Sequence, residues 1–130
     1  MTSRDADTFR RVFEELEAVR TRLGRLEAFE QKRRAYYEER VPLMEAVREN
    51  EQELVGTEQQ FATIRPRLLQ LQEMAKDAEA TPEEYAELLS LAEEGLRYMV
   101  TAERLKERIK AGQAEVVKLD DAFVAMILQF

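Results

Sequence analysis

The chain has 130 residues, of which 45% are hydrophobic and 36% charged, and its formal net charge is −7. It contains no cysteine, histidine or tryptophan, which excludes disulfides, thiolate catalysis, sulfur-ligated zinc sites and the usual histidine proton shuttle. Only four glycines and three prolines interrupt it, so a fold of many short strands is excluded and an all-α class is predicted.

The side chains left for chemistry are carboxylates, Lys, Tyr and Ser, and they form no catalytic pattern in the sequence. We therefore expect no enzyme, no cofactor and no metal site. The amino terminus, MTSRDADTF, is polar and acidic where a secretion signal is basic and then apolar. No stretch approaches the roughly 18 apolar residues of a membrane span. These features predict a cytoplasmic protein that does not associate with a membrane.

The first expected segment, residues 1–41, is a helix that begins after Asp5 or Asp7, whose short acceptor side chains suit an N-cap. Large apolar residues then recur at alternating spacings of three and four, over about three heptads, before the phase changes at Phe29. Because such a seam is not stable in water, residues 1–28 should either fold back as a third helix or pair with another chain. The seam consists of Phe9, Val12, Leu16, Val19, Leu23 and Leu26.

A second helical segment is expected over residues 42–79. Pro42 has no turn-forming neighbours and is interpreted as a kink or a fresh first turn, while Pro66 should bend the helix. Asn50 and Thr57 are polar seam positions that could fix the alignment of the helices. The seam of this segment consists of Val47, Asn50, Leu54, Thr57, Phe61, Ile64, Leu68, Leu71, Ala75 and Ala78.

A return helix is expected over residues 82–130. Thr81 suits the N-cap and Pro82 the first helical position, where no amide bond is lost. Gly95 and Gly112 fall on the seam side, so each marks either a close approach or a weak point, and the helix could break at Gly112. The apolar register should shift between two sets, Tyr85, Leu88, Leu89, Ala92, Leu96 and Met99, then Ala102, Leu105, Ile109, Gly112, Val116, Leu119, Phe123, Met126 and Phe130.

A chain reversal near residue 81 would place residue i opposite roughly residue 161 minus i. Residues 97–110 are mainly basic and the expected partners, residues 51–64, are acidic. Opposite charges favour this antiparallel pairing. We therefore predict a single domain over residues 1–130, either a long antiparallel helical hairpin or a coiled-coil bundle of three to four helices.

Acidic residues concentrate around the expected turn, at Glu79, Glu83, Glu84 and Glu87. This acidic tip could dock on a basic partner surface. A solvated tip whose carboxylates suit the positive end of a helix is favoured over docking. A cation site is not expected here, because carboxylates along one helix face rarely form a closed oxygen cage.

Residues 122–130 form an apolar run with large apolar side chains on more than one side of the expected helix, so more than one side should be buried. We expect it to be surrounded in a bundle or an oligomer; the alternative is a peptide that docks in the groove of a partner. The register places it beside residues 31–38, which include Tyr36 and Tyr37. The expected contact residues are Phe123, Met126, Ile127 and Phe130.

Basic residues gather at Lys32, Arg33 and Arg34, next to Tyr36 and Tyr37. Nucleic acid is bound by this combination of phosphate-binding cations and stacking rings. Acidic residues follow at once and the whole chain is acidic, so a structural role is favoured for the stretch and nucleic acid is not expected as a partner.

These patterns predict a non-catalytic coiled-coil protein that acts in protein–protein interaction or assembly, as an adaptor, a scaffold or a chaperone-like protein. Its partners should be proteins, and self-association is expected, with a homodimer favoured. The alternative is an acidic binding module that acts by charge, such as a nucleic-acid mimic or a chaperone of a basic client. Binding by charge is sensitive to salt, whereas an apolar interface persists in salt.

Overall fold

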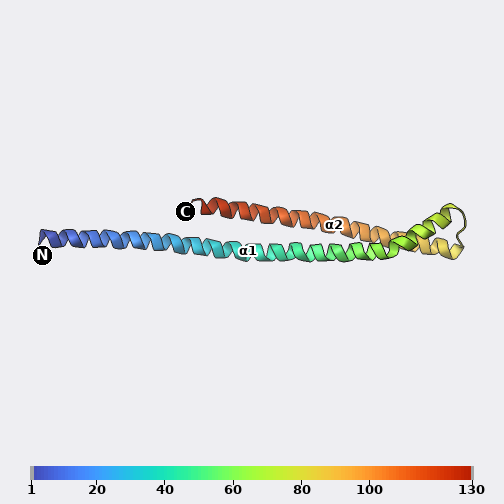
Figure 1. The fold of residues 1–130 in the computed structure, drawn as a ribbon, viewed down its shortest axis with the longest axis horizontal. Coiled ribbons are helices and arrows are strands. Elements are labelled where there is room, and N and C mark those ends of the chain that lie inside the picture. Colours follow the sequence, from blue (N-terminus) through green and yellow to red (C-terminus); the bar gives the residue numbers. More distant parts are fainter. Residues whose placement is uncertain (1, 130) are drawn as a thin grey trace. The chain divides into compact units, whose positions relative to one another are not determined.

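A computed structural model describes residues 2–129 and contains two α-helices, α1 (Ser3–Lys76) and α2 (Pro82–Ile127) (Figure 1). No strand occurs among these residues. The all-α class is therefore confirmed, and two long helices that pack together fit the expected hairpin. The expected bundle of three to four helices is not found, since residues 2–129 contain two.

Contacts within the chain define two units. Unit 1 combines the residues up to Val41 with those from Val117 onward, and unit 2 is Pro42–Val116. The boundary coincides with Pro42, yet α1 includes both Pro42 and Pro66. The segments expected over 1–41 and 42–79 thus belong to one helix. A proline removes one backbone hydrogen bond, and no turn-forming residue beside Pro42 ends the helix there.

Helix α1 begins earlier than expected. Thr2, rather than Asp5 or Asp7, is the N-cap: its hydroxyl accepts a hydrogen bond from the Asp5 N–H at 3.2 Å. The Asp5 carboxylate in turn accepts from the Thr2 N–H at 3.2 Å. This reciprocal pair is the geometry of a capping box, with Asp in the position usually held by Glu or Gln.

In unit 2, α1 and α2 lie side by side and antiparallel (Figure 1). A Cβ built on Gly112 would lie 2.7 Å from Val47 Cγ2, and these two residue numbers sum to 159. In unit 1 the Tyr36 and Phe123 rings are stacked, and their numbers also sum to 159. The pairing expected from charge is therefore found within two residues of its expected register.

The seam of unit 2 is a heptad repeat on both helices. Its buried residues are Val47, Thr57 and Leu71 on α1 and Gly95, Leu105 and Val116 on α2. On α2 the inward positions keep the alternating spacing without interruption. These α2 positions, all buried or half-buried, are Leu88, Leu91, Gly95, Tyr98, Ala102, Leu105, Ile109, Gly112 and Val116.

The register shift expected between Met99 and Ala102 is therefore wrong. Leu89, Leu96 and Met99, which were assigned to the seam, are 64%, 61% and 57% exposed. Two apolar stripes run next to each other on this part of α2. The buried stripe contains Gly95, which has no side chain, and Ala102, which has a small one, so its apolar pattern is weak in the sequence.

Gly112 does not break α2, which continues to Ile127. Gly112 was expected to mark either a close approach of another group or a weak point in the helix. The structure shows a close approach, by the Val47 side chain. At Gly95 an added Cβ would make an ordinary contact, 3.4 Å from a ring carbon of Phe61. Of the two seam glycines, Gly112 is therefore the one where the helices pack more tightly.

Helix α1 ends in a Schellman motif. The Glu79 N–H donates to the Met74 carbonyl at 2.9 Å, and the Ala78 N–H donates to the Ala75 carbonyl at 3.2 Å. Ala78 has a φ of 56°, which is the left-handed region that this motif requires and that glycine occupies most easily.

Thr81 caps α2 as predicted. Its hydroxyl accepts from the Glu84 N–H at 3.2 Å, and the Glu84 carboxylate accepts from the Thr81 N–H at 3.0 Å. Pro82 is the first residue of α2, as expected. The end of one helix and the start of the next are thus both defined by hydrogen bonds within the turn.

Ala78→Gly should raise the free energy of unfolding by about 0.5–1 kcal/mol, because glycine relieves the left-handed strain and so more than offsets its extra freedom in the unfolded chain. The measurement is urea unfolding followed by circular dichroism. Ala80→Gly is the matched control: Ala80 lies in the same turn without a positive φ, so it should lower stability slightly. Equal effects at both positions would contradict the motif.

Candidate interaction surfaces

The N-terminal seam is exposed in unit 1. Phe9 is 71% exposed, and even the least exposed seam residues, Val12 and Val19, are 50% exposed. Within residues 2–129 no third helix folds back on this segment, because α1 continues without a turn from Ser3. Among the described residues, the seam is therefore a stripe of large apolar side chains on the outside of a helix. The six exposed residues are Phe9, Val12, Leu16, Val19, Leu23 and Leu26.

Of the four residues expected to form the C-terminal contact of unit 1, Phe123 packs where the register places it, against Tyr36. The Phe123 ring stacks on the Tyr36 ring with centroids 4.0 Å apart and planes within 6°. Met126 is half-buried and Ile127 is 39% exposed. The fourth expected contact residue, Phe130, lies outside the described residues. The side chain that caps the contact is therefore Tyr36.

Asp120 links the two helices of unit 1, a role that was not expected. Arg40 Nε donates to Asp120 Oδ1 at 3.0 Å, and the Tyr36 hydroxyl donates to the same oxygen. The Arg40 guanidinium and then the Tyr36 hydroxyl lower the pKa of Asp120 below its ordinary value. The hydrogen bond to Asp120 raises the pKa of Tyr36. About a third of each ionic side chain is exposed, so solvent weakens this pair and its main effect is on alignment.

The four carboxylates expected to form an acidic tip have different environments in unit 2. Glu84 belongs to the capping box of α2. Glu87 accepts two hydrogen bonds from Arg67, at 2.8 and 2.9 Å. Glu79 and Glu83 are exposed. Two of the four carboxylates therefore act within the fold, and the other two face solvent.

Stability should fall on acidification through the Glu87–Arg67 pair. The hydrogen bond from Arg67 lowers the pKa of Glu87 below its ordinary 4.5. The unfolded chain therefore takes up this proton at a higher pH than the folded chain, and the stabilisation present above pH 4.5 is lost as pH falls through the folded value. We expect Glu87→Gln to flatten the dependence of unfolding free energy on pH below 4.5. Urea unfolding at pH 7 and in steps below pH 5 measures this dependence.

The control for this pH dependence is Glu83→Gln, which removes an exposed carboxylate from the first turn of the same helix. Glu83 is not the carboxylate that pairs with Arg67, so Glu83→Gln should change the pH dependence of the unfolding free energy less than Glu87→Gln does. If Glu87→Gln and Glu83→Gln changed the unfolding free energy below pH 4.5 equally, the Glu87–Arg67 pair would not be the source of the loss of stability in acid.

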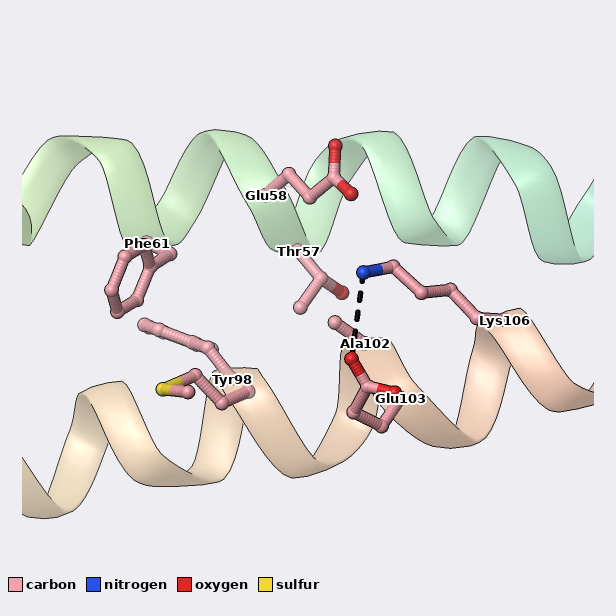
Figure 2. Close-up of a pocket in the computed structure, with 8 residues that line it drawn as sticks. Thr57, Glu58, Phe61, Tyr98, Ala102, Glu103 and Lys106 are labelled. Carbon is pink, nitrogen blue, oxygen red and sulfur yellow. Dashed lines mark hydrogen bonds and ion pairs between the residues drawn. The ribbon is translucent and has the colours of Figure 1, made fainter.

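A groove of about 210 Å³ opens between α1 and α2 in unit 2 (Figure 2). It forms where two small residues, Thr57 and Ala102, occupy facing positions, with Phe61 and Tyr98 toward one end. The Thr57 hydroxyl donates to the Glu53 carbonyl of its own helix at 2.9 Å. Thr57 therefore forms no polar link to α2, contrary to the suggested role in alignment, and its buried oxygen is satisfied.

A second exposed stripe lies on α2 in unit 2, on the face beside the seam. Four of its five members were expected in the core from the sequence, and the fifth, Val100, was not. The same spacing that made those four residues candidates for burial keeps them together on one helix face. The stripe consists of Tyr85, Leu89, Leu96, Met99 and Val100.

Within residues 2–129, no helix is long and apolar enough to cross a membrane. The same residues contain no group of three or more carboxylates placed to hold a metal ion. Comparisons with protein-family models, curated proteins and solved structures found no match.

Proposed function

We propose that the protein acts in assembly, as a non-catalytic adaptor or scaffold that joins protein chains through a helix face, and that it self-associates. The observation that carries this proposal is the exposed N-terminal seam of unit 1. Six large apolar side chains at heptad spacing are each at least 50% exposed there. Heptad seams of this kind bury themselves against another helix.

The free energy gained by burying the N-terminal seam supports the proposal. Moving one large apolar side chain out of water contributes about 1.5–3 kcal/mol, so a buried seam of this length easily offsets the cost of association. Large contiguous apolar patches on a protein surface mark interaction sites. The expected homodimer is the smallest assembly that would cover the seam.

The double substitution Leu16→Asp with Leu23→Asp tests the proposal. It places two charges in the seam, so the assembly should dissociate to a mass near the 15.2 kDa of one chain. Unit 2 should stay folded, because Leu16 and Leu23 are more than half exposed and support no intrachain core. The matched control is Ala18→Asp with Thr21→Asp, two exposed positions off the seam of the same helix. An unchanged mass in the seam variant would contradict the proposal.

The alternative, an acidic module that binds by charge, rests on the net charge of −7 and on the exposed Glu79 and Glu83. It predicts complexes that dissociate between low and high salt. The seam predicts assemblies that persist across the same range. Measuring the mass at both salt concentrations separates the two functions.

A further inference from the structure

We propose that the N-terminal seam pairs with the same seam of a second copy of this chain, with the two helices parallel and in register. This inference rests on the proposed self-association and adds the partner and the orientation. The charges at the two margins of the exposed seam favour this orientation.

The seam residues define a heptad in which Phe9, Leu16 and Leu23 occupy position a. Val12, Val19 and Leu26 occupy position d. Positions e and g flank such a seam and meet the partner helix at its edges. Here Glu15 and Arg22 occupy g, whereas Arg20 and Glu27 occupy e, and all four side chains are exposed.

In a parallel, in-register pair, each g residue faces the e residue of the following heptad on the other chain. Glu15 then faces Arg20 of the second copy, and Arg22 faces Glu27 of the second copy. Both contacts bring opposite charges together, and the twofold symmetry repeats each of them. Arg20 is free to make this contact: its ion pair with Glu17 is 3.3 Å long and leaves the Arg20 side chain 80% exposed.

In an antiparallel pair, fewer of the four charged residues face an opposite charge. There g faces g and e faces e, so Glu15 still meets Arg22 of the second copy. Arg20 and Glu27, however, lie too far apart along the two helices to meet. The parallel arrangement therefore satisfies all four charged positions, and the antiparallel one satisfies two.

The same charge pairs form in parallel assemblies of more than two chains. Leucine at a with a β-branched residue at d also occurs in parallel assemblies of three or four strands. Neighbouring helices of such assemblies form the same g-to-e pairs.

A single cysteine tests the orientation, because the chain has no cysteine of its own. In a parallel pair Val12 faces Val12 of the second copy, so V12C alone should form a disulfide-linked dimer under mild oxidation. In an antiparallel pair centred on the seam, Val12 faces Leu23 of the second copy. V12C alone would then stay uncrosslinked, since cysteines far apart along a helix cannot bridge, and only a mixture of V12C with L23C would link.

Charge exchange tests the contacts themselves. E15R and R20E each place like charges opposite one another in the parallel pair, so each should raise the dissociation constant of the assembly about tenfold. An equal mixture of E15R and R20E should recover the original value, because the altered positions then face each other with opposite charges. E14R makes the same charge change at the outward f position and is the matched control.

Crosslinking of V12C alone, together with recovery in the mixture, supports the inference. An assembly in which only V12C with L23C crosslinks, or in which neither crosslinks, overturns the parallel arrangement and leaves self-association standing. A chain that stays at 15.2 kDa at all concentrations overturns both the inference and the self-association on which it rests.

Discussion

Leu105→Ala should lower the free energy of unfolding by about 2–5 kcal/mol. Leu105 lies on the seam of α2 in unit 2 and is 1% exposed. Truncation removes its buried methyl groups and leaves a cavity that two packed helices cannot easily close. Urea unfolding followed by circular dichroism measures the loss.

The matched control is Leu96→Ala, on the same helix and in the same unit. Leu96 is 61% exposed, so its truncation should change stability by no more than about 0.5 kcal/mol. Comparable losses from Leu105→Ala and Leu96→Ala would contradict the single uninterrupted register of the α2 seam.

Gly112→Ala should also destabilise the protein, although alanine forms helices better than glycine does. The new Cβ would lie 2.7 Å from Val47 Cγ2, and a valine in a helix has little rotamer freedom with which to move away. Overpacking costs about 1–3 kcal/mol, against a gain of about 1 kcal/mol from helix propensity. We expect a net loss of up to about 2 kcal/mol, measured by the same urea unfolding.

Gly56→Ala is the control for this effect, since nothing lies within 4 Å of a Cβ built on Gly56. It should raise stability by about 1 kcal/mol through helix propensity alone. When Val47 is already alanine, Gly112→Ala should cost less unfolding free energy than it does beside Val47, because the close contact with Val47 Cγ2 is gone. A stabilising Gly112→Ala would show that the helices do not approach as closely there as the structure places them.

The parts of the fold that depend on local chemistry could be predicted from the sequence. Thr81, Pro82 and Glu84 carry a capping pattern in which the groups bond one another within a single turn of chain. The antiparallel pairing also followed, because the position of the turn sets which residues face each other. The same register rule places Arg40 within one residue of Asp120, so that ion pair could have been found.

The α2 register near Leu96 could not be predicted, because two apolar stripes of similar strength share that part of the helix. Which stripe faces α1 is decided by close packing, where Gly95 and Ala102 let the helices approach. At the N-terminal seam the sequence left two outcomes open, folding back or pairing with another chain. The unbroken α1 removes the first of these within the described residues.

The measurement that tests the central claim most directly is the mass of the full-length chain by sedimentation equilibrium, at low and at high salt and over a range of concentrations. If the exposed N-terminal seam joins copies of the chain, the mass will be a multiple of 15.2 kDa and will persist at high salt. A mass of one chain under all of these conditions would contradict the claim.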